Sequence, residues 1–315
     1  MSATSIHGVS IPLDSFGQAS ALGATDAEME ARVSLREALR CAASGRIDRA
    51  LAQARDVFGN DAASMELRLE AAKLCVDWHA SLGAYEQCRK VAADAARLGA
   101  SRLERDHPLI LMLRNSEAYW LAVLGCEDMA ARKFSALVAD VKSCPNLDPQ
   151  LAFAIRNNSA MPWKSTGKWA KAARVYRELL ADMEPQCEAE DMTVLTVRDN
   201  LAEVLSADRQ YEEALHLYEI NMEALLRITD RGDWRVLRLR NEIARNTWMG
   251  GDRDEFTARI RTILLMLATL RGDEEKAMSI ARKLQADHPD DWDECDMSEA
   301  VALLAEAGIT GEDFR

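Results

Sequence analysis

Residues 194–219, VLTVRDNLAEVLSADRQYEEALHLYE, decide the fold. In this segment an Asn-Leu-Ala triplet is followed by a large apolar residue, a small residue three positions on and an aromatic residue four further. Spacings of three and four place side chains on one face of an α-helix, so the segment predicts two helices joined by a turn at Arg209. The positions are Asn200, Leu201, Ala202, Tyr211, Ala214 and Tyr218.

This pattern recurs with a period of 42 residues, except that the first copy is offset by 38, and six copies run along the chain. The turn between the first and second helix contains glycine in five copies, at Gly45, Gly83, Gly125, Gly167 and Gly251. The small-residue slot of the second helix holds Ala50, Cys88, Ala130, Ala172 and Ala214. A fixed period of this length indicates an array in which each unit packs against its neighbours. We therefore predict an all-α solenoid of about six helix pairs.

Acidic residues stand where three of the first helices should begin. They are Asp106 before His107-Pro108, Asp148 before Pro149, and Asp191. An Asp side chain accepts hydrogen bonds from the free N–H groups of a first turn, and Pro is well tolerated there. These residues predict helix starts near positions 107, 149 and 191.

These motifs resemble the tetratricopeptide repeat (TPR), in the long 42-residue, kinesin-light-chain-like form of many bacterial, especially actinobacterial, proteins. The resemblance covers about residues 30–265 and is clearest in residues 194–219. It implies a right-handed α-solenoid whose first helices line an inner, concave surface. The sequence departs from the family where Arg209 replaces the turn glycine and where Phe256 fills a small-residue slot, so the last copy is expected to be irregular.

The composition divides the chain into three expected parts. Residues 1–24 are rich in Ser, Gly and Ala without a helical period, which is typical of a flexible N-terminal arm. Residues 25–270 form the TPR-like solenoid, and residues 271–315 form C-terminal capping helices with an acidic tail.

Charge and hydropathy exclude several classes of partner. The net charge of −13 argues against a sequence-independent nucleic-acid binder or an anionic-membrane binder, because both need a basic surface. The longest apolar run, Ile263–Ala268, is too short to span a bilayer. The seven cysteines show no paired spacing and are expected to be reduced thiols in a cytoplasmic protein.

The search for catalytic chemistry is negative. The sequence contains no Gly-rich phosphate loop, no G-x-S-x-G and no H-E-x-x-H, and its five histidines are scattered. The acidic cluster at 290–296 lacks the Gly and terminal Glu of a calcium loop. We therefore expect no enzyme, no catalytic residue, no cofactor and no metal ion.

One column of residues is not explained by the core. Steps of 42 residues give Arg114, Arg156, Arg198 and Arg240. Beside them stand five asparagines, which are Asn115, Asn157, Asn158, Asn200 and Asn241. Asn is a poor residue for a helix interior because its amide competes for backbone hydrogen bonds. Its repeated placement on first helices therefore points to a function.

Two interpretations of this column stay open, and they are compatible. By the family resemblance, the asparagines form a ladder in a peptide-binding groove, where each amide pairs with the main chain of an extended peptide and each Arg contacts carboxylates. Alternatively, each Arg pairs with an acidic residue late in the preceding second helix, such as Asp140 or Asp182, and the asparagines tie neighbouring first helices together.

The function that the sequence favours is a non-catalytic scaffold or adaptor that binds a peptide or protein segment in the concave groove. The alternative is a peptide-sensing regulator that modulates a bound effector protein, which would resemble the peptide-sensing repeat regulators of Gram-positive bacteria. Such regulators usually carry a separate N-terminal module, and the 24-residue arm is too small for one.

The arm generates a first prediction. Ile6, Val9, Ile11, Leu13 and Phe16 are separated by small and polar residues, like a ligand for a groove. If the arm docks on its own solenoid it mimics the ligand, and if it docks on a neighbouring copy the chain is a homo-oligomer. Deletion of residues 1–20 should then raise affinity for peptides or lower the mass measured by light scattering. If neither quantity changes, the arm has no such role.

Overall fold

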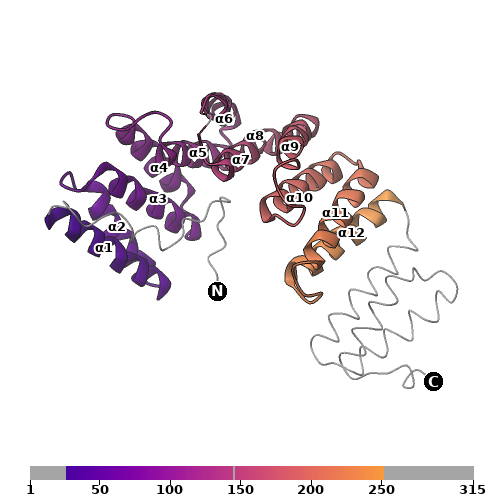
Figure 1. The fold of residues 1–315 in the computed structure, drawn as a ribbon, viewed down its shortest axis with the longest axis horizontal. Helices are drawn as coiled ribbons and strands as arrows, with labels where there is room; N and C mark the ends of the chain where they lie inside the picture. The colour runs from indigo at the N-terminus through magenta and orange to yellow at the C-terminus, as the bar shows by residue number, and fades with distance from the viewer. Residues whose placement is uncertain (1–25, 145, 252–315) are drawn as a thin grey trace, which may run out of the picture. The chain divides into compact units, whose positions relative to one another are not determined.

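The structure, a computed structural model, describes residues 26–144 and 146–251, and within them every regular element is a helix (Figure 1). The expected arm (1–24) and the expected capping segment (271–315) lie outside the described residues. The helices are α1 (Asp26–Ala43), α2 (Ile47–Gly59), α3 (Met65–Ser81), α4 (Tyr85–Gly99), α5 (Pro108–Val123), α6 (Glu127–Lys142), α7 (Pro149–Asn158), α8 (Met161–Ser165), α9 (Trp169–Met183), α10 (Met192–Ala207), α11 (Tyr211–Leu226) and α12 (Trp234–Gly250).

The chain divides into two compact units, Met1–Val175 and Tyr176–Arg315, with the boundary inside α9. In the first unit the helices from α1 to α6 pack in chain order, each on the next, and α7 and α8 pack on α5 and α6. In the second unit α11 packs on both α10 and α12. The first helices also meet one another, since α3 contacts α1 and α5, and α5 contacts α7. The repeat that the sequence predicts is therefore an α-helical repeat array in the structure.

The small-residue slot lies where two helices approach most closely. All five residues of this slot are fully buried, with no exposed surface; they are Ala50, Cys88, Ala130, Ala172 and Ala214. The aromatic slot beside it is filled by Phe134, Tyr176 and Tyr218, which are no more than 3% exposed. A small side chain in the slot lets the helix backbones approach, and the aromatic ring fills the space that remains.

The turns between first and second helices need a left-handed backbone. The five turn glycines have φ between +66° and +102°, which glycine adopts without a steric penalty. Arg209, in the turn between α10 and α11, has φ +63° and is the only non-glycine residue with positive φ in the part of the chain that the structure describes. The turn geometry is thus kept where the sequence lacks glycine, at the cost of backbone strain.

Two of the three predicted helix starts use the expected Asp. The Asp148 side chain accepts from the Gln150 N–H at 3.0 Å, and the Asp191 side chain accepts from the Thr193 N–H at 2.6 Å. The prediction for Asp106 is wrong, because His107 is the N-cap of α5 and its Nδ1 accepts from the Leu109 N–H at 3.3 Å. His107 is the residue directly before Pro108, so its side chain, and not that of Asp106, reaches the first turn.

The first helix of the fourth copy is broken. It ends as α7 at Asn158 and resumes as α8 at Met161. Pro162 explains the break, because proline has no N–H to donate to the carbonyl of Asn158 and its ring clashes with that carbonyl. This interruption falls directly after Asn157 and Asn158, two residues of the predicted site.

Arg209→Gly should stabilise the protein. Glycine removes the strain of a left-handed Arg, and we expect the free energy of unfolding to rise by about 1 kcal/mol, measured by chemical denaturation. Gly125→Ala is the matched control, since a Cβ added at Gly125 meets nothing within 4 Å and only the backbone (φ +77°) opposes it. That variant should lose about the same amount. Equal stability of Arg209→Gly and wild type would contradict this account.

Candidate functional site

The candidate site is the surface that the first helices form in each unit. In the first unit these helices are α1, α3, α5 and α7, and in the second unit they are α10 and α12. The nine residues predicted from the sequence all lie on α5, α7, α10 and α12. Their exposure and contacts differ strongly, so we describe the arginines and the asparagines separately.

Arg114 braces two helices of the same repeat. Its guanidinium lies on α5 and donates to a carboxylate oxygen of Asp140 on α6 at 2.6 Å. Both side chains are about three-quarters buried, with 21% and 24% of their surface exposed. Arg105 also donates to Asp140, at 3.3 Å. The sequence identified Asp140 as a partner but placed it beside the following arginine, whereas it pairs with the first helix of its own repeat.

Arg198 has a similar role in the second unit. It is 6% exposed, it donates to the Asn221 side-chain oxygen on α11 at 3.1 Å, and it lies 3.5 Å from the Glu184 carboxylate after α9. Asn221 in turn donates to the Leu195 carbonyl of α10 at 2.8 Å. Arg240 is equally buried at 6%, whereas Arg156 is half-buried. The buried arginines therefore lie between helices and away from solvent.

Three asparagines form a hydrogen-bonded chain across two first helices. The Asn157 amide donates to Asn158 at 3.2 Å, and the Asn158 amide on α7 donates to the Asn115 side-chain oxygen on α5 at 3.3 Å. Asn115 and Asn158 are buried, at 4% and 9% exposed, while Asn157 is half-buried. The buried pair ties neighbouring first helices together, and it fixes which way the amide of Asn157 faces.

The remaining asparagines lie in the second unit and are more accessible. Asn200 is half-buried on α10, and Asn241 is exposed on α12. In the first unit a ligand could therefore contact Asn157 directly, whereas Asn115 and Asn158 support that surface from within. In the second unit Asn200 and Asn241 are the accessible amides.

Two charged pairs on this surface were not identified from the sequence. Lys73 on α3 stands 42 residues before Asn115 and is 5% exposed, with its ammonium 2.5 Å from the Asp77 carboxylate. Asp199 on α10 pairs with Arg238 on α12 at 3.0 Å. The period places Asp199 in the asparagine column, and one further step of 42 residues before Asn115 would have found Lys73 there. Their partners become visible only in the tertiary structure.

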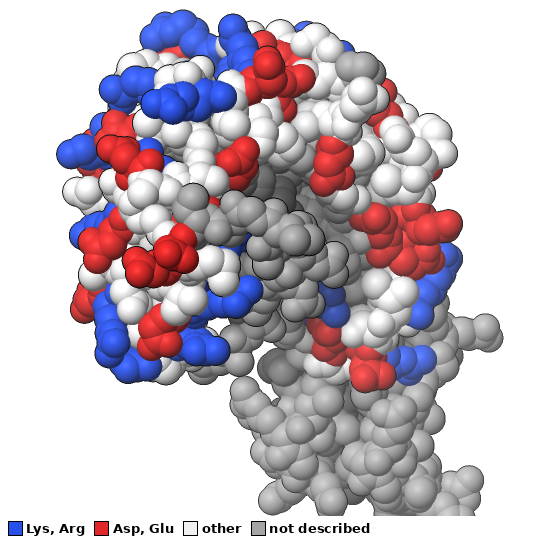
Figure 2. Space-filling model, turned by 60° about the vertical axis from the view of Figure 1, so that its left-hand side comes forward, with Lys and Arg blue, Asp and Glu red and all other residues white. Residues whose placement is uncertain are grey.

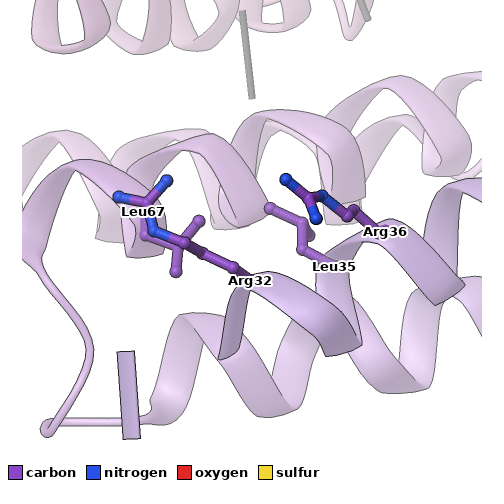
Figure 3. Close-up of a pocket in the computed structure, with 4 residues that line it drawn as sticks. All are labelled: Arg32, Leu35, Arg36 and Leu67. Atoms are coloured by element: carbon purple, nitrogen blue, oxygen red, sulfur yellow. The ribbon is translucent and has the colours of Figure 1, made fainter. Parts of the chain in front are cut away.

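A small depression lies between α1 and α3. Its floor is Leu35 and Leu67, and the guanidiniums of Arg32 and Arg36 stand over them (Figure 3). Its space of about 10 Å³ holds no more than a single water molecule. Arg32 also pairs with Glu28 at 2.9 Å. The depression is therefore too small to be a ligand pocket.

The described residues present a mixed surface. Acidic and basic side chains are interspersed on the face shown in Figure 2, where neither sign gathers into a large patch. Within residues 26–144 and 146–251, no group of three or more His, Cys, Asp or Glu is placed to hold a metal ion. No helix in that part of the chain is long and apolar enough to cross a bilayer. The acidic cluster at 290–296 lies outside the described residues.

Comparison with known proteins identifies the fold. No protein-family model matches the sequence, and no curated protein is similar to it. Among solved structures, the nearly identical TPR-like repeats of a Podosopora anserina protein described as kinesin light chain give a TM-score of 0.57 at 18% identity, covering 65% of this chain and 96% of that one. BtubC (BKLC) from P. vanneervenii gives 0.54 at 18% identity, covering 85% and 96%.

A third structural neighbour is the quorum sensor NprR, solved in apo form from B. thuringiensis and in complex with its cognate peptide NprX. The two structures give TM-scores of 0.57 and 0.53 at 12% identity. Each match covers 90% of this chain, and it covers 78% of the apo NprR chain and 79% of the NprR chain in the complex. The structural neighbours are thus TPR-repeat proteins, and this chain has the fold of a TPR-like α-solenoid. At identities below a fifth, the likeness concerns the fold alone.

The asparagine chain generates a stability prediction. Asn158→Ala removes the donor to the buried Asn115 and should lower the free energy of unfolding by about 1–3 kcal/mol, despite the better helix propensity of Ala. Asn241→Ala is the control, because Asn241 is exposed on α12 and its replacement should leave the stability equal or slightly higher. Thermal and denaturant unfolding measure both. If Asn158→Ala unfolds at the wild-type midpoint, the amide pair does not tie the helices.

Proposed function

We propose that the protein is a non-catalytic scaffold or adaptor that binds an extended peptide or protein segment on its first-helix surfaces. The observation that carries this proposal is the oriented chain from Asn157 through Asn158 to Asn115. Its buried members hold a half-exposed amide in a fixed orientation on a surface, and such an amide can pair with a peptide main chain whatever the peptide sequence.

The arginine braces support the same proposal. Arg114 and Arg198 fix α5 on α6 and α10 on α11. Rigid first helices keep accessible side chains such as Asn157, Asn200 and Asn241 in place before a ligand arrives, which lowers the entropy lost on binding. We therefore assign Asn157, Asn200 and Asn241 to ligand contact, with Arg156 beside Asn157, and we assign the other predicted site residues to support.

Further observations fit a protein-interaction module inside the cell. The six cysteines in the described residues are free thiols, three of them buried, as expected of a protein in a reducing compartment. On the face shown in Figure 2, the basic side chains do not gather into the patch that nucleic acids or anionic membranes would require. We propose a cytoplasmic location and a protein or peptide partner.

A peptide-sensing regulator is the second candidate. It is favoured by the structural neighbour NprR, which was solved with its cognate peptide NprX. The two candidates differ in the consequence of peptide binding, because a regulator then changes its affinity for a second protein, whereas an adaptor does not. Titration of a captured effector with and without peptide separates them.

The test of the proposal is a change in peptide affinity without a change in stability. A peptide selected from a random library on the full-length chain should bind the Asn157→Ala variant less tightly than wild type by about 1–3 kcal/mol, measured by fluorescence anisotropy. Asn146→Ala is the matched control, since Asn146 is exposed in the loop before α7. If both variants bind like wild type, Asn157 does not contact the ligand. If the library yields no peptide at all, the proposed function fails.

A further inference from the structure

The segment that runs from α7 into α9 carries only positive charges. Residues 149–177 contain six Lys and Arg and no Asp or Glu, in a chain whose net charge is −13. In the other second helices α2, α4, α6 and α11 the second residue is acidic, whereas α9 has Ala170 there; the acidic residues are Asp48, Glu86, Asp128 and Glu212. The turn between α8 and α9 therefore lacks the negative charge that the corresponding turns carry.

Two lysines of this turn gather around one indole ring. The ammonium of Lys168 lies 5.6 Å from the centroid of the Trp163 ring, and that of Lys171 lies 4.8 Å from it. Both distances are within the range of an attractive cation–π contact. Trp163 is half-buried on α8, and both lysines are exposed. These three residues form a group that solvent reaches, called here the Trp163 corner.

The turn itself holds this group together. The Lys168 N–H donates to the Trp163 carbonyl at 2.8 Å, and the Thr166 hydroxyl donates to the Pro162 carbonyl at 2.8 Å. Gly167 takes the left-handed backbone, at φ +66°, that lets the chain turn back in this way. The two ends of the turn are therefore fixed on each other, and Lys168 stands beside the indole before any ligand arrives.

Neither lysine is neutralised by the protein. Among the described residues, no carboxylate lies within ion-pair distance of Lys168 or Lys171. Exposure does not explain this, because the Arg97 side chain is 77% exposed and still pairs with Asp94 at 2.8 Å. An ammonium carries three N–H donors, and the face of a ring engages the positive charge without accepting all of them. Both lysines therefore have donors available to an external acceptor.

We propose that the Trp163 corner binds a carboxylate of an acidic segment in a protein partner, with Lys168 and Lys171 donating to its oxygens. The charges are complementary, since the corner offers two cations and no anion. Two ammonium groups suit one or two carboxylates and are too few for the row of phosphates that a nucleic acid presents. The corner lies at the turn between α8 and α9, so it is an interaction surface in addition to the asparagines of the proposed function.

The contact with the indole favours such binding. A free lysine side chain loses much rotamer freedom when it pairs, whereas a lysine that already lies against a ring loses less. Hydrogen bonds from ammonium groups to a carboxylate are charge-assisted and are stronger than neutral ones. Since the site is at the surface, dissolved salt screens it, and the affinity should fall as the salt concentration rises.

The experiment is a differential peptide selection. Random twelve-residue peptides are selected on the full-length chain and depleted on the double variant Lys168→Gln, Lys171→Gln, so that only peptides that need these lysines remain. The enriched peptides should be rich in Asp and Glu. A synthetic copy of the best peptide should bind the double variant about 10-fold more weakly than wild type, measured by fluorescence anisotropy. Added salt should reduce this difference.

Two further variants sharpen the test. The double variant Lys90→Gln, Lys142→Gln is the matched control, because both lysines are exposed and the same charge is removed away from the corner. It should bind the peptide like wild type. Trp163→Leu keeps Lys168 and Lys171 but removes the ring that holds them, and it should weaken binding several-fold. The lysine variants alter only exposed side chains and should unfold at the wild-type midpoint, so they decide the matter even if Trp163→Leu folds poorly.

Three results would overturn this inference. The first is a differential selection that yields no peptide rich in Asp and Glu. The second is equal weakening by the two double variants, which would mean that only the net charge matters. The third is a short single-stranded DNA that binds more tightly than the peptide and is lost in Lys168→Gln, Lys171→Gln, which would identify a nucleic-acid site. None of these results bears on the proposed function, whose test uses Asn157→Ala.

Discussion

The close approach of first and second helices is the constraint on which the rest of this structure depends. In the second helices α2, α4, α6, α9 and α11, one position holds a side chain no larger than that of Ala or Cys, and each of these five positions is fully buried. A larger residue would separate the helix backbones and leave voids that the neighbouring aromatic ring could not fill. The constraint repeats every 42 residues from Cys88 to Ala214, after a first step of 38 residues from Ala50.

Polar side chains beside these contacts must find partners, because a buried charge or amide without one is costly. Arg114 donates a hydrogen bond to Asp140, Arg198 donates to Asn221, and Asn158 donates to Asn115. Each pair joins two helices. Because hydrogen bonds and ion pairs are directional, these pairs fix the register of one helix on the other, which apolar packing specifies less strictly. The Asn158–Asn115 pair also holds a nearby amide, that of Asn157, which donates to Asn158.

The proposed function depends on the side chains that the first helices present to a partner. In the first unit the accessible groups include a half-buried amide beside a helix break caused by Pro162. In the second unit they include the exposed Asn241.

The sequence by itself determined the period, the helix pairs, the buried small and aromatic slots, and the turn positions, because each depends on residues close together in the chain. It also identified the Arg and Asn column, but not which members are accessible. Asn115 and Asn241 occupy the same position of the repeat, yet Asn115 is only 4% exposed whereas Asn241 is an exposed residue. Asn115 is buried because its helix, α5, contacts the first helices α3 and α7. The sequence could not assign Asp140 to Arg114 rather than Arg156, because both arginines lie within one period of it. Only tertiary packing decided these pairings and brought Asp199 of α10 and Arg238 of α12 together.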